Sequence, residues 1–417
     1  AQVNALGGFD FAFTLPENAN LGYATISLQA VGSLGELDGR DYYHSFQIQE
    51  FRRPEFEVSA RNETSGPYFV GDHAVVAVAA NYYAGGPLPN AEVTWLVTSS
   101  TSQYSPPNWL DFNFGIWRPW WWGYEMAYEG GIVIPGETGF EVETFSGVTD
   151  ASGEHYLRLD FEEAVGLQPF SVLAEASVID VNRQAWAGTT SLLVHPAEFY
   201  VGLRSARTFV ERGDPLEIDL IVTDIDGNPV EDRVIEVTAA RMEWKYSGGD
   251  WRQEEVDPQA CEVGSKLEPV SCTFETPVGG RYRITALVTD QGGRQNMSQL
   301  TRWVSGAERP PARNVEQETV ELVPDQESYQ PGETARILVQ APFSPAEGLL
   351  TVSRSGMLYN EPFRMDESTL TLEIPIEEAQ LPNLHVQVDL VGSAARVDEQ
   401  GEEVPGAPPR PAYASGT

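Results

Sequence analysis

One short pattern occurs three times in this chain and limits what it can fold into. The three segments are "PYFVGDHAVVAVAA" from Pro67, "RTFVERGDPLEIDLIV" from Arg207 and "ESYQPGETARILVQA" from Glu327. Each contains an aromatic residue near its start, reaches Gly71, Gly213 or Gly332 after a short spacer, and continues with alternating apolar residues. A glycine at positive φ permits a tight turn, and alternation is typical of a strand with one buried face. The pattern predicts a tandem array of β domains that open in the same way.

Further segments repeat as well and indicate the type of domain. "YYAGGPLPNAEVTWLV" and "TDIDGNPVEDRVIEVTA" each place Gly and Pro in a turn before a strand, and "GVTDASGEHYLRLDF" and "VGGRYRITALVTDQGGRQ" each combine a Thr-Asp turn with a strand. Such hairpins, in a chain with 38 Gly and 29 Pro, are typical of antiparallel sandwiches of the immunoglobulin or fibronectin type. We therefore predict an all-β fold of tandem sandwiches.

The spacing of the repeats predicts the domain boundaries. Residues 1–51 contain three strand candidates, "FDFAFTL", "YATISLQA" and "YHSFQIQEF", which are too few for a closed sandwich, so we expect the C-terminal part of a domain. Complete sandwiches are expected over 52–196, 197–306 and 319–392, with a linker over 307–318 and a flexible tail over 393–417. At the first boundary, Arg52-Arg53-Pro54 predicts a stiff extended crossing, because proline fixes φ and suits the start of a strand.

The charge balance excludes one class of partner. The chain has 62 acidic and 26 basic residues, a formal net charge of −36, and the acidic residues are scattered along it. Nucleic acid is excluded as a partner because phosphate neutralisation needs clustered basic residues. No apolar run has the length of a membrane span. We expect a solvated acidic surface.

The two cysteines, Cys261 and Cys272, lie in "ACEVGSKLEPVSCTF". They predict a small disulfide loop across a hairpin, since a pair of cysteines with no histidine nearby is a poor metal site. A disulfide suits an oxidising compartment, which favours an extracytoplasmic location: periplasm, cell envelope or outside the cell.

Catalytic and metal-binding patterns are weak. The five histidines are scattered over separate strands or turns, at His44, His73, His155, His195 and His385. No Ser/His/Asp or Cys/His set is suggested, so we expect no enzyme activity, no catalytic residue and no cofactor. "TDIDGNP" resembles a calcium loop at Asp224 and Asp226, but it lacks the further oxygen ligands. The two aspartates more simply favour a turn, and calcium stays an open alternative.

An aromatic insertion interrupts the second domain over about 100–146. Its core, "NWLDFNFGIWRPWWWGYEMAYEGG", contains Trp109, Trp117, Trp120, Trp121 and Trp122. Exposing so much aromatic surface is unfavourable, so we favour packing on its own domain or on a neighbour. The alternatives are an interaction patch for a protein, a platform for a sugar, or a membrane-surface anchor.

Taken in order, four parts of the chain resemble one family. "EFRRPEFEV", "GDHAVVAVAANYYAGGPLPNAEVTW", "SVIDVNRQAWAGTTSLLVHPAEFYVGL" and "LVPDQESYQPGETARILVQAPF" with "LLTVSRSGML" resemble bacterial alpha-2-macroglobulins, large envelope proteins built from macroglobulin β-sandwich domains. The resemblance implies a protease trap, in which a protease cuts an exposed bait segment and a thioester then captures it.

The thioester motif of that family is Cys-x-x-Gln, and neither Cys261 nor Cys272 has the glutamine. The resemblance therefore implies a macroglobulin-domain fragment without the thioester domain, which acts as a scaffold of a broad-spectrum endopeptidase inhibitor that protects the cell envelope. Its partners would be proteases, through the full-length protein, and neighbouring macroglobulin domains. Two other classes stay open: a rod-like surface adhesin or interaction module of immunoglobulin-like repeats, and an accessory region of a carbohydrate-active enzyme.

Overall fold

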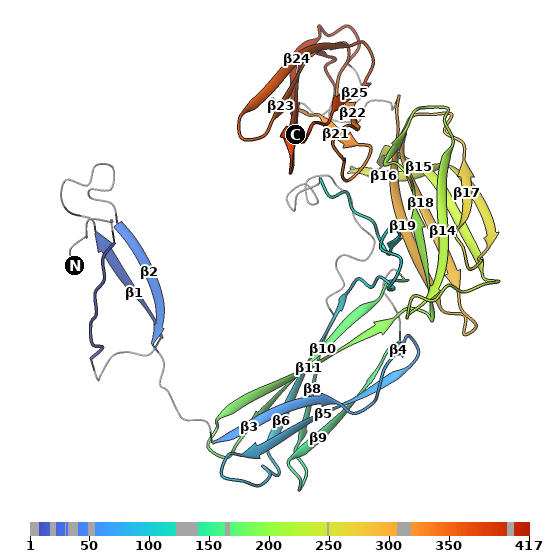
Figure 1. Ribbon diagram of the computed structural model, residues 1–417. Helices are drawn as coiled ribbons and strands as arrows, with labels where there is room; N and C mark the ends of the chain where they lie inside the picture. The colour runs from blue at the N-terminus through green and yellow to red at the C-terminus, as the bar shows by residue number, and fades with distance from the viewer. Residues whose placement is uncertain are drawn as a thin grey trace.

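A computed structural model describes residues 8–16, 22–29, 31, 41–48, 55–121, 141–162, 167–247, 250–306, 318–397 and 404–417 (Figure 1). Strands dominate these residues, and no α-helix occurs among them; a short 3-10 helix, η3, covers Glu378–Gln380. Within the same ranges no helix is long and apolar enough to cross a membrane. The prediction of an all-β fold of tandem sandwiches is confirmed. The Arg52-Arg53-Pro54 crossing and most of the linker over 307–318 lie outside the described residues.

The N-terminal unit, domain 1, is a two-stranded antiparallel sheet. Strands β1 (Gly22–Gln29) and β2 (Asp41–Ile48) pair along their full length. The structure assigns no strand to residues 8–16, where the sequence predicted a third one. This segment instead places the ring of Phe13 edge-on to Phe46 of β2, with ring centroids 6.4 Å apart. Domain 1 is thus a hairpin with aromatic contacts and no second layer among the described residues.

Domain 2 is a sandwich of two antiparallel sheets that a short parallel strand extends. Its strands are β3 (Phe56–Asn62), β4 (Tyr68–Phe69), β5 (His73–Tyr82), β6 (Glu92–Thr101), β8 (Glu141–Val148), β9 (Glu154–Asp160), β10 (Phe170–Ile179) and β11 (Ala185–His195). One sheet has the order β4-β11-β10-β6-β8 and the other β3-β5-β9. Alternate residues of facing strands form the core, for example Val76, Val78, Trp95 and Val178. Alternation along each strand therefore gives the sandwich its dry interior.

Domain 3 is a second sandwich and takes one strand from the segment that belongs to domain 2 in sequence. Its own strands are β12 (Phe199–Arg204), β13 (Phe209–Val210), β14 (Leu216–Asp224), β15 (Val234–Ser247), β16 (Asp250–Gly264), β17 (Val270–Phe274), β18 (Gly280–Thr289) and β19 (Gln295–Val304). One sheet has the order β17-β14-β12-β7 and the other β13-β19-β18-β15-β16. The added strand, β7 (Asn113–Phe114), comes from the tryptophan-rich insertion.

Domain 4 is a third sandwich, and it corrects one prediction. Its strands are β20 (Glu318–Thr319), β21 (Glu321–Pro324), β22 (Thr334–Gln340), β23 (Ala346–Ser353), β24 (Met357–Met365), β25 (Thr369–Pro375), β26 (His385–Ala394) and β27 (Arg410–Gly416). The sheet orders are β20-β27-β26-β23-β24 and β21-β22-β25. The flexible tail predicted over 393–417 is wrong for β27, which pairs with β26 and, in parallel, with β20. Its apolar residues Ala412 and Ala414 are buried in the domain core, which Gly and Pro in the tail did not indicate.

The repeated opening of the three sandwiches has the predicted turn. Gly71, Gly213 and Gly332 have φ of 88°, 94° and 97°, values that glycine adopts without strain. Each glycine precedes a strand, β5, β14 or β22, and donates its N–H to a carbonyl just beyond the partner of that strand. The acceptors are Phe161 after β9, Thr276 after β17 and Ile376 after β25. The same turn therefore fixes the start of the same strand in each domain.

Candidate functional site

The tryptophan-rich insertion leaves domain 2 after β6 and runs over domain 3. We call its residues 102–121 the strap. Near its start, Tyr104 donates its hydroxyl to the carbonyl of Ile225, and the indole of Trp109 donates to the carbonyl of Gly227 at 3.0 Å. Both acceptors lie just beyond β14 in domain 3. The first half of the strap is therefore bound to the neighbouring domain.

Two phenylalanines of the strap fill a seat on the outer face of domain 3. Phe112 and Phe114 are each 6% exposed and pack with Tyr200 and Ile221, which point away from the core of domain 3. The seat depends on Gly202: a Cβ there would lie 2.7 Å from the ring of Phe114. Arg204 stacks its guanidinium 4.5 Å from the centroid of the Phe112 ring. A small residue and a cation thus shape a surface that fits two aromatic rings.

The middle of the strap crosses the edge of the sandwich and bonds to both sheets. In one sheet, β7 pairs with β12, where Phe114 lies opposite Gly202. In the other sheet, Gln299 of β19 donates its N–H to the carbonyl of Gly115 at 2.9 Å and accepts from the N–H of Trp117 at 2.9 Å. Backbone groups on an open edge need such partners. The strap therefore closes the edge formed by β12 and β19.

The end of the strap reaches a cluster that three domains share. We call the cluster of Trp117, Trp121, Phe209, Trp303, Val323 and Leu338 the junction cluster. The first two residues come from the strap, the next two from domain 3 and the last two from domain 4. Ring centroids of Trp117 and Trp121 lie 6.2 and 5.6 Å from that of Trp303. Domains 2, 3 and 4 thus meet at one apolar contact.

A buried cation borders the junction cluster. The guanidinium of Arg302 lies 4.8 Å from the centroid of the Trp117 ring, and Arg302 is 5% exposed. Burial lowers the pKa of Arg302 to about 9. It stays protonated at neutral pH, so the aromatic face of Trp117 interacts with a full positive charge.

Polar contacts complete the joint between domains 3 and 4. Thr208 donates its N–H to the carbonyl of Asp325 at 3.1 Å. Glu211 forms an ion pair with Arg336 at 3.1 Å and accepts a hydrogen bond from the hydroxyl of Thr371 at 3.1 Å. These groups are part-buried, which places them around the apolar contact of Val323 and Leu338.

The joint between domains 2 and 3 contains a second buried polar set. His195, the last residue of β11, lies 2.8 Å from the hydroxyl of Tyr200 in β12, measured from Nδ1. Burial lowers the pKa of His195, so the ring is neutral near pH 7. Close by, Arg294 pairs with Glu198 at 2.7 Å and with Asp290 at 2.8 Å, and stacks 4.7 Å from the centroid of Phe69. Domain 2 therefore contacts domain 3 through more than the strap.

The structure places the sequence-predicted tryptophans unequally. Trp109, Trp117 and Trp121 pack against domain 3, in agreement with the favoured interpretation of packing on a neighbour. Trp120 is 41% exposed and contacts Trp117 and Trp121 edge-on. Trp122 lies outside the described residues. Sequence patterns did not indicate the seat itself, and the available signals were Gly202 and Gly227, glycines on strand or turn positions that the strap approaches closely.

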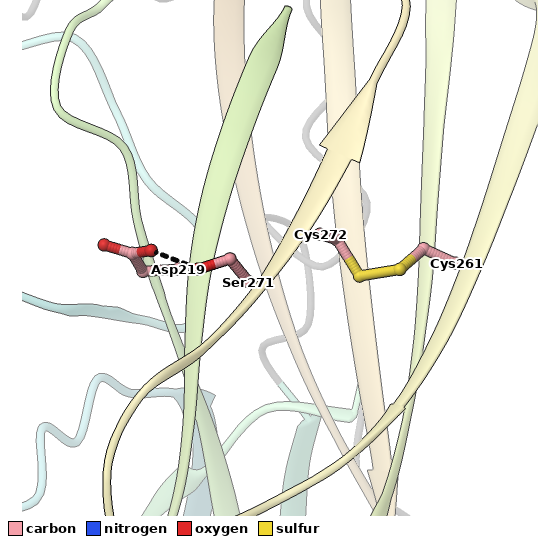
Figure 2. Close-up of a disulfide and its surroundings, with 4 residues drawn as sticks. All are labelled: Asp219, Cys261, Ser271 and Cys272. Atoms are coloured by element: carbon pink, nitrogen blue, oxygen red, sulfur yellow. Dashed lines mark hydrogen bonds between the residues drawn. A yellow bond between two sulfur atoms is a disulfide. The ribbon is translucent and has the colours of Figure 1, made fainter.

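The structure bonds Cys261 to Cys272 in domain 3, with Cα atoms 6.2 Å apart (Figure 2). The predicted hairpin around this bond is wrong, because β16 pairs with β15 in one sheet and β17 pairs with β14 in the other. Figure 2 shows Cys272 pointing towards Cys261, while the adjacent Ser271 points the opposite way and donates to Asp219 at 2.8 Å. The disulfide thus joins the two sheets at the edge opposite the strap.

Asp224, which the sequence suggested as a calcium ligand, caps a turn. One carboxylate oxygen of Asp224 accepts from the N–H of Asp226 at 2.9 Å and of Asn228 at 2.8 Å, and the other accepts from the side-chain amide of Asn228 at 2.9 Å. The same five-residue turn recurs at Asp150, Asp180 and Asp290. In the part of the chain that the structure describes, no group of three His, Cys, Asp or Glu side chains could hold a metal ion.

The histidines are not brought together into a catalytic set. They lie on five different strands, β2, β5, β9, β11 and β26. His44, His73 and His385 are exposed, whereas His155 accepts a hydrogen bond from the indole of Trp95 at 3.1 Å. Burial lowers the pKa of His155. The partly buried His155 and the buried His195 thus have local structural partners.

Most comparisons with known proteins point to alpha-2-macroglobulins. A family model described as the alpha-2-macroglobulin bait region domain matches residues 320–410. The alpha-2-macroglobulin homolog of Nostoc sp. is 24% identical over 410 residues, which are 95% of this chain and 20% of that protein. Circularly permutated Ras protein 2 of Dictyostelium discoideum is 28% identical over 268 residues, which are 57% of this chain and 6% of that protein.

Among solved structures, native Escherichia coli alpha-2-macroglobulin is 17% identical, with a TM-score of 0.45; the match covers 96% of this chain and 25% of that one. The chain thus spans about a fifth of the length of the Nostoc relative and a smaller part of the Dictyostelium one.

Proposed function

The chain belongs to the bacterial alpha-2-macroglobulin family, and from this premise we propose that it is a scaffold segment of a broad-spectrum endopeptidase inhibitor, a protease trap that protects the cell envelope. The observation that carries the proposal is the match of residues 320–410, which form most of domain 4, to the bait region domain. In this proposal domain 4 carries or adjoins the segment that a protease cuts, and domains 2 and 3 hold it in place.

The joints between the domains support a scaffold role. A trap converts one cut into a movement, which requires elements with two arrangements mounted on a stable base. Domains 2 and 3 are tied by the strap, by the hydrogen-bonded pair of His195 and Tyr200, and by the contact of the Arg294 guanidinium with the ring of Phe69. Domain 4 contacts this base through the junction cluster and the polar groups around it. Because residues 320–410 of domain 4 match the bait region domain, domain 4 is the element that we expect to move.

We assign no catalytic residue to the chain, and its partners in this proposal are proteases and neighbouring macroglobulin domains. The disulfide between Cys261 and Cys272 favours an oxidising, extracytoplasmic compartment. The charge of −36 supports exposure to solvent and disfavours nucleic acid as a partner.

The test uses a protein of the length of the Nostoc relative in which this chain is joined to the remaining domains of an alpha-2-macroglobulin. It is mixed with trypsin or elastase, and hydrolysis of casein and of a small chromogenic amide is followed. A trap is expected to suppress casein hydrolysis while the small substrate is still cleaved, because enclosure blocks only large substrates. The 417-residue chain alone is expected to suppress neither. Unchanged casein hydrolysis with a molar excess of the whole protein would refute the proposal.

A further inference from the structure

We infer that the strap couples domain 4 to the joint between domains 2 and 3. Loss of the contact between domains 3 and 4 is expected to loosen the end of the strap, and loss of that end is expected to loosen domain 4. The inference rests on packing and hydrogen bonds, so it stands or falls independently of any protease-trapping activity.

The two halves of the strap are held differently. The first half buries Phe112 and Phe114 in the seat on domain 3 and bonds Trp109 to Gly227. These contacts involve domain 3 alone. The second half, from Trp117 to Trp121, packs on Trp303, whose other neighbours include Val323 and Leu338 of domain 4. Only the second half therefore depends on where domain 4 lies.

Strand β19 connects the two contacts. Its Gln299 exchanges two backbone hydrogen bonds with the strap, one from its own N–H to Gly115 and one from the N–H of Trp117. Four residues later, Trp303 donates its N–H to the carbonyl of Thr208 at 3.0 Å, and Thr208 donates its own N–H to Asp325 of domain 4 at 3.1 Å. Backbone hydrogen bonds at both ends, connected by the backbone of β19 between Gln299 and Trp303, thus join domain 4 to the strap, beside the apolar path through Trp303.

Buried polar groups make the strap end easy to release. The Nε atom of Arg302 and the indole nitrogen of Trp121 are both buried without a hydrogen-bond partner among the residues that the structure describes. Each such group gains hydration when the cover opens. The packed state is therefore favoured mainly by apolar contact, and removing part of that contact from the domain 4 side shifts the balance towards opening.

Hydrogen exchange of the intact chain, measured on peptides by mass spectrometry, tests the coupling. In Leu338→Ala we expect at least about tenfold faster exchange of the amides of Gly115, Trp117 and Gln299, because local opening free energies set these rates. The matched control is Val339→Ala. Val339 is the next residue of β22 but faces the core of domain 4, so its truncation should accelerate exchange within domain 4 only.

Coupling between sites is reciprocal, so the opposite direction is measured as well. Trp121→Ala should accelerate exchange of the Thr208 amide, which donates to Asp325, also about tenfold. Leu110→Ala, at a strap position that is 96% exposed, should change nothing. The inference is overturned if Leu338→Ala leaves the strap amides at the wild-type rate, or if Trp121→Ala leaves the Thr208 amide there. It is also overturned if Val339→Ala accelerates the strap as strongly as Leu338→Ala does.

Discussion

Domain 3 has two open edges, and the chain closes them in different ways. At one edge, Cys261 and Cys272 join β16 to β17 by a covalent bond within the domain. At the other edge, the strap from domain 2 bonds to β12 and β19 and covers the outer face with Phe112 and Phe114. The covalent closure belongs to domain 3 alone, whereas the strap makes the stability of domain 3 depend on domain 2.

The two closures of domain 3 differ in whether they depend on the neighbouring domains. A disulfide acts mainly by restricting the unfolded chain and keeps the edge closed whatever the neighbouring domains do. The strap acts through contacts in the folded state, and its end at Trp117 and Trp121 also touches domain 4 through Trp303. The edge with the disulfide therefore stays closed in every arrangement of the domains, whereas closure of the edge with the strap depends on where domain 4 lies.

Truncation in the seat has the largest expected effect. Phe114→Ala should lower the free energy of unfolding by about 3–5 kcal/mol, since it empties a buried aromatic site. It should also expose the strap amides to faster exchange. Urea denaturation followed by circular dichroism measures the loss, with Leu110→Ala as the control that should lie within about 0.5 kcal/mol of wild type. A loss below about 1 kcal/mol would mean that the seat contributes little to the stability of domain 3.

Removal of the disulfide comes next. The double substitution of Cys261→Ser and Cys272→Ser should lower the free energy of unfolding by about 3 kcal/mol, the value that loop entropy gives for a short loop. Because this effect arises in the unfolded chain, the strap amides should exchange at the wild-type rate under native conditions. Non-reducing mass spectrometry checks the bond itself, and a mass two daltons above the oxidised value, which means free thiols in the native protein, would contradict it. Accelerated hydrogen exchange in the strap would show that the two edges of domain 3 are not independent.

Filling the seat should cost less than emptying it. Gly202→Ala places a methyl group 2.7 Å from the Phe114 ring, and overpacking of this kind costs about 1–3 kcal/mol. In the double variant with Phe114→Ala the closest contact of the methyl group is removed, while Cγ2 of Ile221 stays 2.9 Å away, so the two losses should not add. A double-mutant cycle by urea denaturation measures this coupling, and strict additivity would show that Gly202 and Phe114 do not interact in solution.

The smallest effect concerns pH at the joint between domains 2 and 3. Burial by itself would raise the pKa of Asp290, but hydrogen bonds from the N–H of Glu198 and from Arg294 outweigh it and lower the pKa. A carboxylate with a depressed folded-state pKa stabilises the fold above its unfolded pKa of about 3.9, and the stabilisation is lost as pH falls through the folded value.

Asp290→Asn should therefore cost about 1 kcal/mol at pH 7 and less as the pH falls below about 4. Thermal unfolding at a series of pH values measures the difference. If the stability difference between Asp290→Asn and wild type stayed constant down to pH 2, the loss would come from altered hydrogen-bond geometry and not from the loss of the charge.

Several features of this protein follow from the sequence alone because they depend on neighbouring residues. Alternation specified strands such as β6 and β18, and Gly71, Gly213 and Gly332 adopt the positive φ that the repeated pattern required. The aspartate of "TDIDGNP" caps its own turn, which residues within five positions decide. The tandem all-β architecture was predictable on the same grounds, since local periodicity defines strands and turns.

Which segments pair or pack with one another depends on the tertiary structure. The sequence does not tell which sheet β16 or β17 joins, so the two cysteines were placed in a hairpin although their bond crosses the sandwich. Likewise, the small apolar residues of β27 lie among Gly and Pro and become a strand only because β26 and β20 offer free edges. The strap is the clearest case. Its phenylalanines are buried because Gly202, distant in sequence, leaves room for a ring, and such complementarity arises only when the domains meet.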